Sequence, residues 1–160
     1  MEQYEYNLLQ NNGFTFSLDR IPQTTFRVVG FDLPSISVPA PSAGNPSSTQ
    51  YFPGSSVEFD ALTMDFLVDE NLKNYEEIYR WITQQRFCNK DFQPKNDSEI
   101  KLVSDGVLIT MTNASNPNRI FYFKDLFPIS LSGMRFDTSI SEPAPITCTV
   151  TFRFSYFELR

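Results

Sequence analysis

The chain has 160 residues, a length that suits one domain with a substantial hydrophobic core. Its formal net charge is −6 and it carries no basic cluster, which argues against a protein that holds nucleic acid on a Lys/Arg-rich face. It contains no histidine, which excludes Ser/His and Cys/His nucleophilic pairs and every His-based metal site. The isolated glycines form no phosphate-binding loop, so we expect no cofactor and no catalytic site.

The first part of the chain predicts an arm and two strands. Residues Met1–Asn12 lack a clear period and form a possible N-terminal arm. Apolar and polar residues alternate from Phe14 to Asp19, which is typical of a strand with one buried face. A second strand is expected over Thr24–Phe31, with Phe26 and Val28 on one face.

The segment Leu33–Ser56 is rich in proline and serine. Proline removes ladder donors and fixes φ, so we expect no internal strand here. A segment of this length is too long for a simple connector, which leaves a mobile insertion or an assembly loop that docks on another subunit. Apolar residues that a solvated linker would lack favour the assembly loop: Ile36, Val38, Tyr51 and Phe52.

The next run, Val57–Val68, predicts a long two-faced strand. Its alternation changes parity near Ala61-Leu62, so we expect a β-bulge or sharp twist there. Three carboxylates occupy polar positions on or near this strand: Glu58, Asp60 and Asp65.

A single amphipathic helix is predicted directly after this strand, from about Glu70 to Gln85 or Arg86. Asp69 is suited to the N-cap, and Glu70 complements the positive end of the helix dipole. Apolar residues recur at helical spacing at Leu72, Tyr75, Tyr79 and Ile82. Asp65, Asp69 and Glu70 could also pair as glycosidase carboxylates, but caps and a polar strand face explain them better.

The C-terminal half reads as further short strands. The segment Glu99–Thr112 predicts a hairpin that turns at Asp105-Gly106. The last strand, Ile146–Tyr156, has the cleanest alternation, with its even-numbered residues facing the core. Residues 1–160 therefore predict one mainly β domain, an antiparallel β-sandwich or flattened barrel with one flanking α-helix.

The sequence contains two cysteines and one tryptophan. Cys88 and Cys148 lie in no metal-ligand or redox spacing, and we expect free thiols, with a disulfide as the alternative. Trp81 is the one tryptophan. It is expected to anchor the helix to the sheet, with an inter-subunit anchor as the alternative.

The order of elements resembles the tail-tube protein family of contractile-tailed bacteriophages. The likeness rests on the Pro/Ser-rich loop, the following strand, and Val68–Tyr75 opening a helix that contains Trp81-Ile82. Gly13–Leu18, Val28–Pro34 and Thr147–Leu159 are similar to the first and last strands of that family. The resemblance covers most of the chain.

The resemblance implies a structural virion protein and no enzyme. Hexameric rings would stack into the inner tail tube, with their sheets joined in one continuous barrel and DNA passing through without specific binding. Implied partners are further copies of the chain, the tail sheath, and baseplate or neck proteins, with assembly in the host cytoplasm. Glu58, Asp60 and Asp65 would be the acidic candidates for the lumen, where like charge keeps DNA from sticking.

Other interpretations remain open at the level of sequence. A tube initiator or terminator of the baseplate or neck would share the same fold. A carbohydrate-binding β-sandwich module would also explain many aromatic residues without catalytic ones. No run approaches the length needed to span a membrane, so a membrane partner is not expected.

Overall fold

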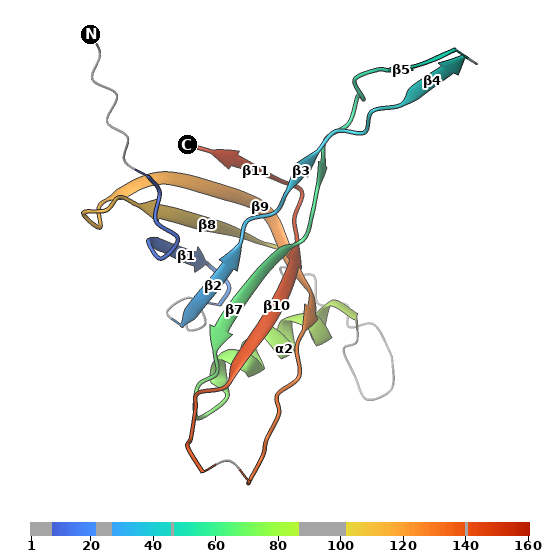
Figure 1. Ribbon diagram of the computed structural model, residues 1–160. Coiled ribbons are helices and arrows are strands. Elements are labelled where there is room, and N and C mark those ends of the chain that lie inside the picture. The colour runs from blue at the N-terminus through green and yellow to red at the C-terminus, as the bar shows by residue number, and fades with distance from the viewer. Residues whose placement is uncertain (1–7, 22–26, 46, 87–101, 140) are drawn as a thin grey trace.

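The computed structural model describes residues 8–21, 27–45, 47–86, 102–139 and 141–160. Its centre is a seven-stranded antiparallel sheet with the order β1-β8-β9-β10-β7-β2, in which β11 also pairs with β9 (Figure 1). The bounds of its strands are β1 Phe14–Leu18, β2 Val28–Asp32, β7 Leu62–Leu67, β8 Ser104–Met111, β9 Pro117–Leu131, β10 Thr147–Arg153 and β11 Tyr156–Leu159.

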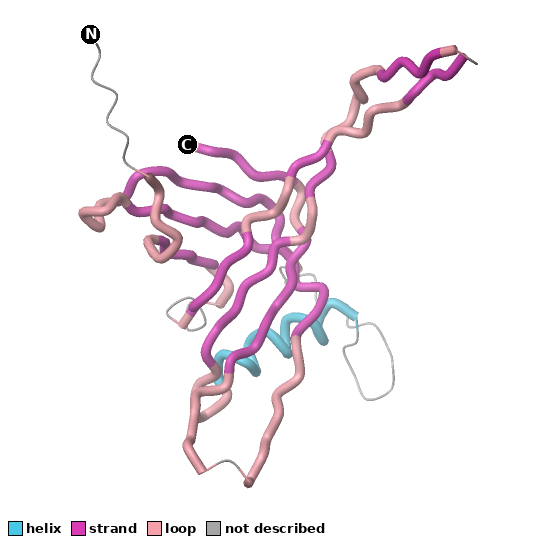
Figure 2. The backbone as a smooth tube through the Cα atoms, viewed as in Figure 1, coloured by secondary structure: helices cyan, strands magenta, loops and turns pink. Residues whose placement is uncertain are grey.

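The long strand β9 joins two layers of this sheet. Its first half pairs with β8 and β11, and its second half pairs with β10. Figure 2 shows the two groups of strands crossing at an angle. One layer therefore contains β1, β8, β11 and the first half of β9. The other contains β2, β7, β10 and the second half of β9, and is called the second layer below.

Aromatic side chains fill the space where the two layers meet. The ring centroids of Phe16 and Phe31 are 4.8 Å apart, and those of Phe31 and Phe123 are 6.1 Å apart. These contacts bring β1 close to β2, although no ladder joins the two strands. The result is an open, flattened barrel around one apolar core, the mainly β antiparallel fold that the sequence predicted.

The predicted faces of the two central strands are confirmed. Leu62, Met64 and Phe66 of β7 are buried, as are Cys148, Val150 and Phe152 of β10. Strand pairing is interrupted between β6 (Glu58–Phe59) and β7, at Asp60-Ala61, where the change of parity predicted a bulge or twist. Cys148 is a buried free thiol, whereas Cys88 lies outside the described residues.

The predicted turn at Asp105-Gly106 is wrong. Both residues lie inside β8, and the hairpin to β9 turns after Met111 instead. Gly106 is needed for packing, because a Cβ there would lie 2.6 Å from Leu126 Cδ1. The glycine therefore marks a close approach of side chains inside the sheet.

The one helix of the described residues, α2, spans Lys73–Arg86 and begins later than predicted. Asp69 does not cap it, since its carboxylate pairs with Arg27 at 3.0 Å. The buried Asn74 holds the entry instead. Its side chain accepts hydrogen bonds from the Asp69 and Tyr75 amides, at 3.0 and 2.9 Å, and donates to the Leu67 carbonyl at 2.7 Å.

The buried face of α2 is also rotated from the predicted one. Ile78 and Trp81 are buried, and Tyr75 and Ile82 pack partly against the core. Leu72 and Tyr79, in contrast, are 41% and 55% exposed. Among the described residues, no helix has both the length and the apolar character to cross a membrane.

Candidate assembly surfaces

A two-stranded ribbon projects from the body and contains most of the Pro/Ser-rich segment (Figure 1). At its base, β3 (Ile36–Ser37) pairs with β6, and farther out β4 (Ser42–Asn45) pairs with β5 (Ser48–Tyr51). The expectation that this segment forms no strand is wrong. Pro34, Pro39, Pro41 and Pro53 lie outside the short strands, where they remove no ladder donor. Residues 33–57 are called the arm below.

The base of the arm is fixed to the body. The Phe59 ring lies 5.6 Å from Phe154 and 5.4 Å from Phe157, measured between centroids. The Asp60 amide donates to the Ser35 carbonyl at 3.1 Å, and the Ser35 hydroxyl donates to the Asp60 carboxylate. These contacts give the arm a defined direction.

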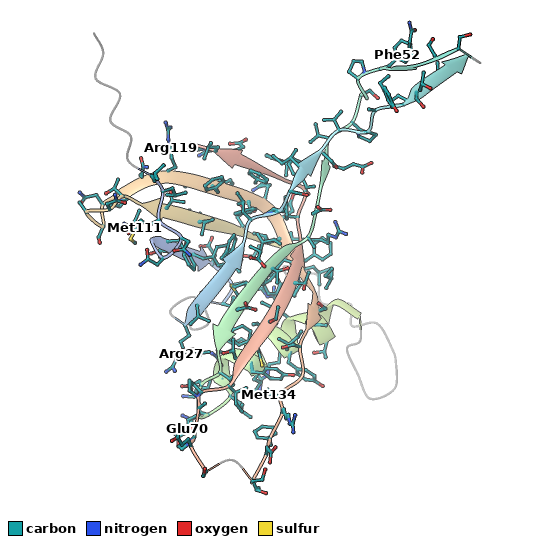
Figure 3. All side chains as sticks on the ribbon, viewed as in Figure 1. Arg27, Phe52, Glu70, Met111, Arg119 and Met134 are labelled. Atoms are coloured by element: carbon teal, nitrogen blue, oxygen red, sulfur yellow. The ribbon has the colours of Figure 1, made fainter. Side chains whose placement is uncertain are left out.

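The arm exposes apolar side chains from its base outward. The four predicted docking residues are Ile36 at 55%, Val38 at 51%, Tyr51 at 73% and Phe52 at 48% exposure (Figure 3 labels Phe52). Gly54 lies so close to the Pro39 carbonyl that a Cβ would collide with it, and the Phe52 amide donates to the Pro41 carbonyl at 2.9 Å. The arm thus holds its own shape while its apolar residues stay open to solvent.

A second candidate surface is the polar face of the second layer. Hydroxyl side chains line it: Thr63, Thr147, Thr149, Thr151 and Ser130. Asp65 lies among them, accepting a hydrogen bond from Thr149 Oγ1 at 2.5 Å and lying against Gly30. The structure separates the three predicted lumen carboxylates, because Glu58 and Asp60 are at the base of the arm and Asp65 is in the middle of the layer.

The two outer strands of the second layer can accept further strands. Each neighbouring pair in the order β9-β10-β7-β2 is antiparallel, so β2 and β9 run in opposite directions. Each outer strand also carries an exposed apolar residue at a register shift, Val29 at 51% on β2 and Ile129 at 47% on β9. A second copy could therefore join β2 to β9 and keep the antiparallel alternation.

The third candidate surface is a shallow groove on α2, with a volume of about 420 Å³. Its lining residues are Asn71, Leu72, Tyr75, Glu76 and Tyr79. Arg80 pairs with Glu76 at 2.6 Å, which balances the only charge in this lining. The helical spacing of Leu72, Tyr75 and Tyr79 predicted that these residues face the core, but Leu72 and Tyr79 are exposed.

Trp81 does not belong to these open surfaces. It is 1% exposed, its indole Nε1 donates to the Leu102 carbonyl at 2.8 Å, and its ring lies 6.0 Å from that of Phe152. Arg20 covers another part of the ring, with its Cζ 5.0 Å from the centroid. The residue therefore lies between helix and sheet.

A charged cluster crosses β8 and β9 in the layer that also contains β1 and β11. Asp105 accepts hydrogen bonds from Lys124 Nζ at 2.6 Å, from the Tyr122 hydroxyl at 2.7 Å and from the Asp125 amide at 3.2 Å. The Lys124 hydrogen bond is the main reason that the pKa of Asp105 falls to about 2. Every partner stabilises the carboxylate, so this arrangement is suited to holding the strands together. No group of three or more His, Cys, Asp or Glu side chains in the described part of the chain could hold a metal ion.

Solved structures with the same architecture come from contractile injection systems. One is a chain of an extracellular contractile injection system, the PVC sheath-tube complex in its extended state, with a TM-score of 0.68 at 14% identity over 98% of this chain and 93% of that chain. The chain has a tail-tube-like fold.

Two further structures support this fold. A chain of the PVC sheath/tube terminator in its extended state gives a TM-score of 0.66 at 16% identity, covering 99% of both chains. A chain of the 6-fold symmetrised anti-feeding prophage baseplate gives 0.59 at 12% identity, over 92% of this chain and 90% of that chain. No protein-family model and no curated protein sequence matches. The similarity to these three structures shows the tail-tube-like fold of the chain.

Proposed function

We propose that this protein is a structural, non-enzymatic subunit that assembles into rings and stacked rings, forming the hollow inner tube of a contractile tail or injection device. The observation that carries the proposal is the arm, an ordered ribbon on which Ile36, Val38, Tyr51 and Phe52 are exposed, with no covering element among the described residues. Exposed apolar surface on an ordered projection is typical of a protein interaction site. The tail-tube-like fold supports the same role.

The second layer supplies a route to ring closure. An antiparallel sheet whose outer strands run in opposite directions can be repeated around an axis without any parallel join, and a closed ring leaves no free edge. Hexameric rings are the closure we propose, in line with the 6-fold assembly that contains one similar chain. The polar face of the layer, with Asp65 and its neighbouring threonines, would then line the bore.

Such a lining would bind anionic cargo weakly. The polar face carries mainly hydroxyls, together with the carboxylates of Asp32 and Asp65 and the guanidinium of Arg153, which donates to the Phe59 carbonyl at 3.2 Å. Strong counterion release from DNA requires several Lys or Arg side chains on one face. We propose passage of DNA through a bacteriophage tail as the specific form of this function, with sheath and baseplate or neck proteins as the outer partners. Assembly would take place in the host cytoplasm and the product would belong to the virion tail.

A terminator ring at the end of the tube is the second candidate. The similarity to a PVC sheath/tube terminator chain, with a TM-score of 0.66, favours it about as much as the sheath-tube complex favours a main tube subunit. The two roles differ in number, since a main subunit repeats along the tube and a terminator forms one or two rings.

Electron microscopy of the purified full chain tests the proposal. Long hollow tubes indicate a main tube subunit, and isolated rings indicate an end ring. A monomer that shifts on titration with glycans would instead support a carbohydrate-binding module and contradict assembly.

A matched variant tests the arm. Replacing residues 33–56 with a short Gly/Ser linker should leave the body folded, because the buried core lies outside this segment apart from Pro34. Circular dichroism should show the strand and helix signals retained, while microscopy should show no stacked rings. Tubes of normal length from this variant would reject the arm as an assembly element.

A further inference from the structure

The arm has an unusual composition for an exposed ribbon. No charged residue occurs between Asp32 and Glu58, although 20% of the chain is charged. Exposed strand edges in monomeric proteins are normally protected by charges, especially lysine, against pairing with other chains. An uncharged arm loses no charge solvation when it is covered, so its composition suits a buried state in the assembly.

The arm and the groove on α2 lie at opposite ends of β7. β6 at the base of the arm leads into β7, and Asn74 then fixes the start of α2 at the far end of that strand. Figure 1 shows the arm beyond one end of β7 and the start of α2 beyond the other. A second copy shifted along this direction would bring one copy's arm toward the other copy's groove.

The groove has surface properties that complement the arm. Leu72, Tyr75 and Tyr79 supply apolar and aromatic surface, and Asn71 supplies an amide. Arg80 pairs with Glu76, so an uncharged ribbon would meet no unbalanced carboxylate there. Tyr51 and Phe52 of the arm would gain burial of their rings, at about 25 cal/mol per Å² of apolar surface covered.

We propose that the arm of one copy docks on the α2 groove of a second copy, with Tyr51 and Phe52 against Leu72, Tyr75 and Tyr79. This contact rests on the proposed stacking of rings and identifies its receiving surface. It is heterologous, joining the arm end of one copy to the helix end of the next, and therefore continues along a tube without closing on itself.

Cysteine cross-linking between two variants tests the contact. Tyr51→Cys and Tyr79→Cys are made separately in a Cys88→Ser background and mixed under mild oxidation. Docking raises the effective concentration of the two thiols, so the mixture should give about tenfold or more disulfide-linked dimer than either variant alone. A mixture of Tyr51→Cys with Tyr156→Cys is the matched control, because Tyr156 is also an exposed tyrosine, at 43%.

A charge substitution gives an independent measurement. Tyr79→Glu would place an unbalanced carboxylate in the groove and should shorten stacks of rings, whereas Tyr156→Glu should leave them unchanged. Equal cross-linking of the two mixtures, or stacks of unchanged length in Tyr79→Glu, would overturn the assignment of the groove.

Microscopy of the Cys88→Ser parent separates this inference from the proposed function. Stacked rings in the parent together with no specific cross-link would reject the groove as the receiving surface and leave the tube function intact. A parent that forms neither rings nor tubes would reject both. Stacked rings with the specific cross-link would support both.

Discussion

Truncation of Phe152 measures how much the two-layer core depends on β10. Phe152 is fully buried, lies opposite Leu62 and Pro128, and contacts the Trp81 ring at a centroid distance of 6.0 Å. A buried aromatic side chain removes about 150–250 Å² from water, which corresponds to about 4–6 kcal/mol at 25 cal/mol per Å². Alanine retains a small part of that surface, so we expect Phe152→Ala to lower the free energy of unfolding by about 3–5 kcal/mol.

The matched control is the preceding residue on the other face. Thr151 lies opposite Thr63 and Ser130 on the polar side of the second layer, so Thr151→Ala should change the free energy of unfolding by less than about 1 kcal/mol. Urea unfolding followed by circular dichroism compares the two variants, at a concentration where both are monomeric. Equal losses, or a larger loss for Thr151→Ala, would refute the assignment of faces on which the core and the polar surface both depend.

Two further predictions concern charge. The pKa of Asp105 is held at about 2, below its ordinary value near 3.8, so its stabilising contribution is complete above pH 4 and is lost as the pH falls toward 2. Urea midpoints measured from pH 5 to pH 2 should therefore fall less steeply for Asp105→Asn than for the unmodified chain, and parallel curves would contradict this. The unmodified protein should show no measurable affinity for duplex DNA at moderate salt, whereas replacement of Glu58, Asp60 and Asp65 by lysine should produce binding with a steep salt dependence in a filter-binding series. Because Asp65 accepts the Thr149 hydrogen bond, a Glu58→Lys/Asp60→Lys double variant that spares it is the control for folding, and strong DNA binding by the unmodified protein would contradict a passive bore.

The strand faces could be predicted from sequence because one buried face imposes a period of two. The alternation in Leu62–Leu67 and Thr147–Arg153 therefore matches the observed burial residue by residue. Turn-forming composition was a poorer guide where contacts with residues distant in sequence determine the conformation. Asp105-Gly106 has turn composition, but Leu126 requires the glycine and Lys124 holds the aspartate.

The start of the helix shows the same limit. Asp69 has the side chain of an N-cap, yet Arg27, distant in sequence, takes its carboxylate. Asn74 supplies the hydrogen bonds that fix the entry, from a position inside the helix where asparagine has no local advantage. The spacing of residues along the chain shows neither the pairing of Arg27 with Asp69 nor the hydrogen bonds of Asn74.

The apolar positions in α2 and at Leu72 just before it show why an assembly surface is difficult to separate from a core by sequence. Leu72 and Tyr79 have the helical spacing of a buried stripe, and burial by the chain itself or by another copy would select the same residue types. Only the fold shows that Ile78 and Trp81 face the sheet while Leu72 and Tyr79 face outward. The arm has the same property. Its exposed apolar side chains are unfavourable in water and would be stabilised by burial against another copy, and its lack of charge avoids a desolvation cost on that burial. Two surfaces of this kind at opposite ends of one domain are the arrangement that a chain stacking head to tail requires.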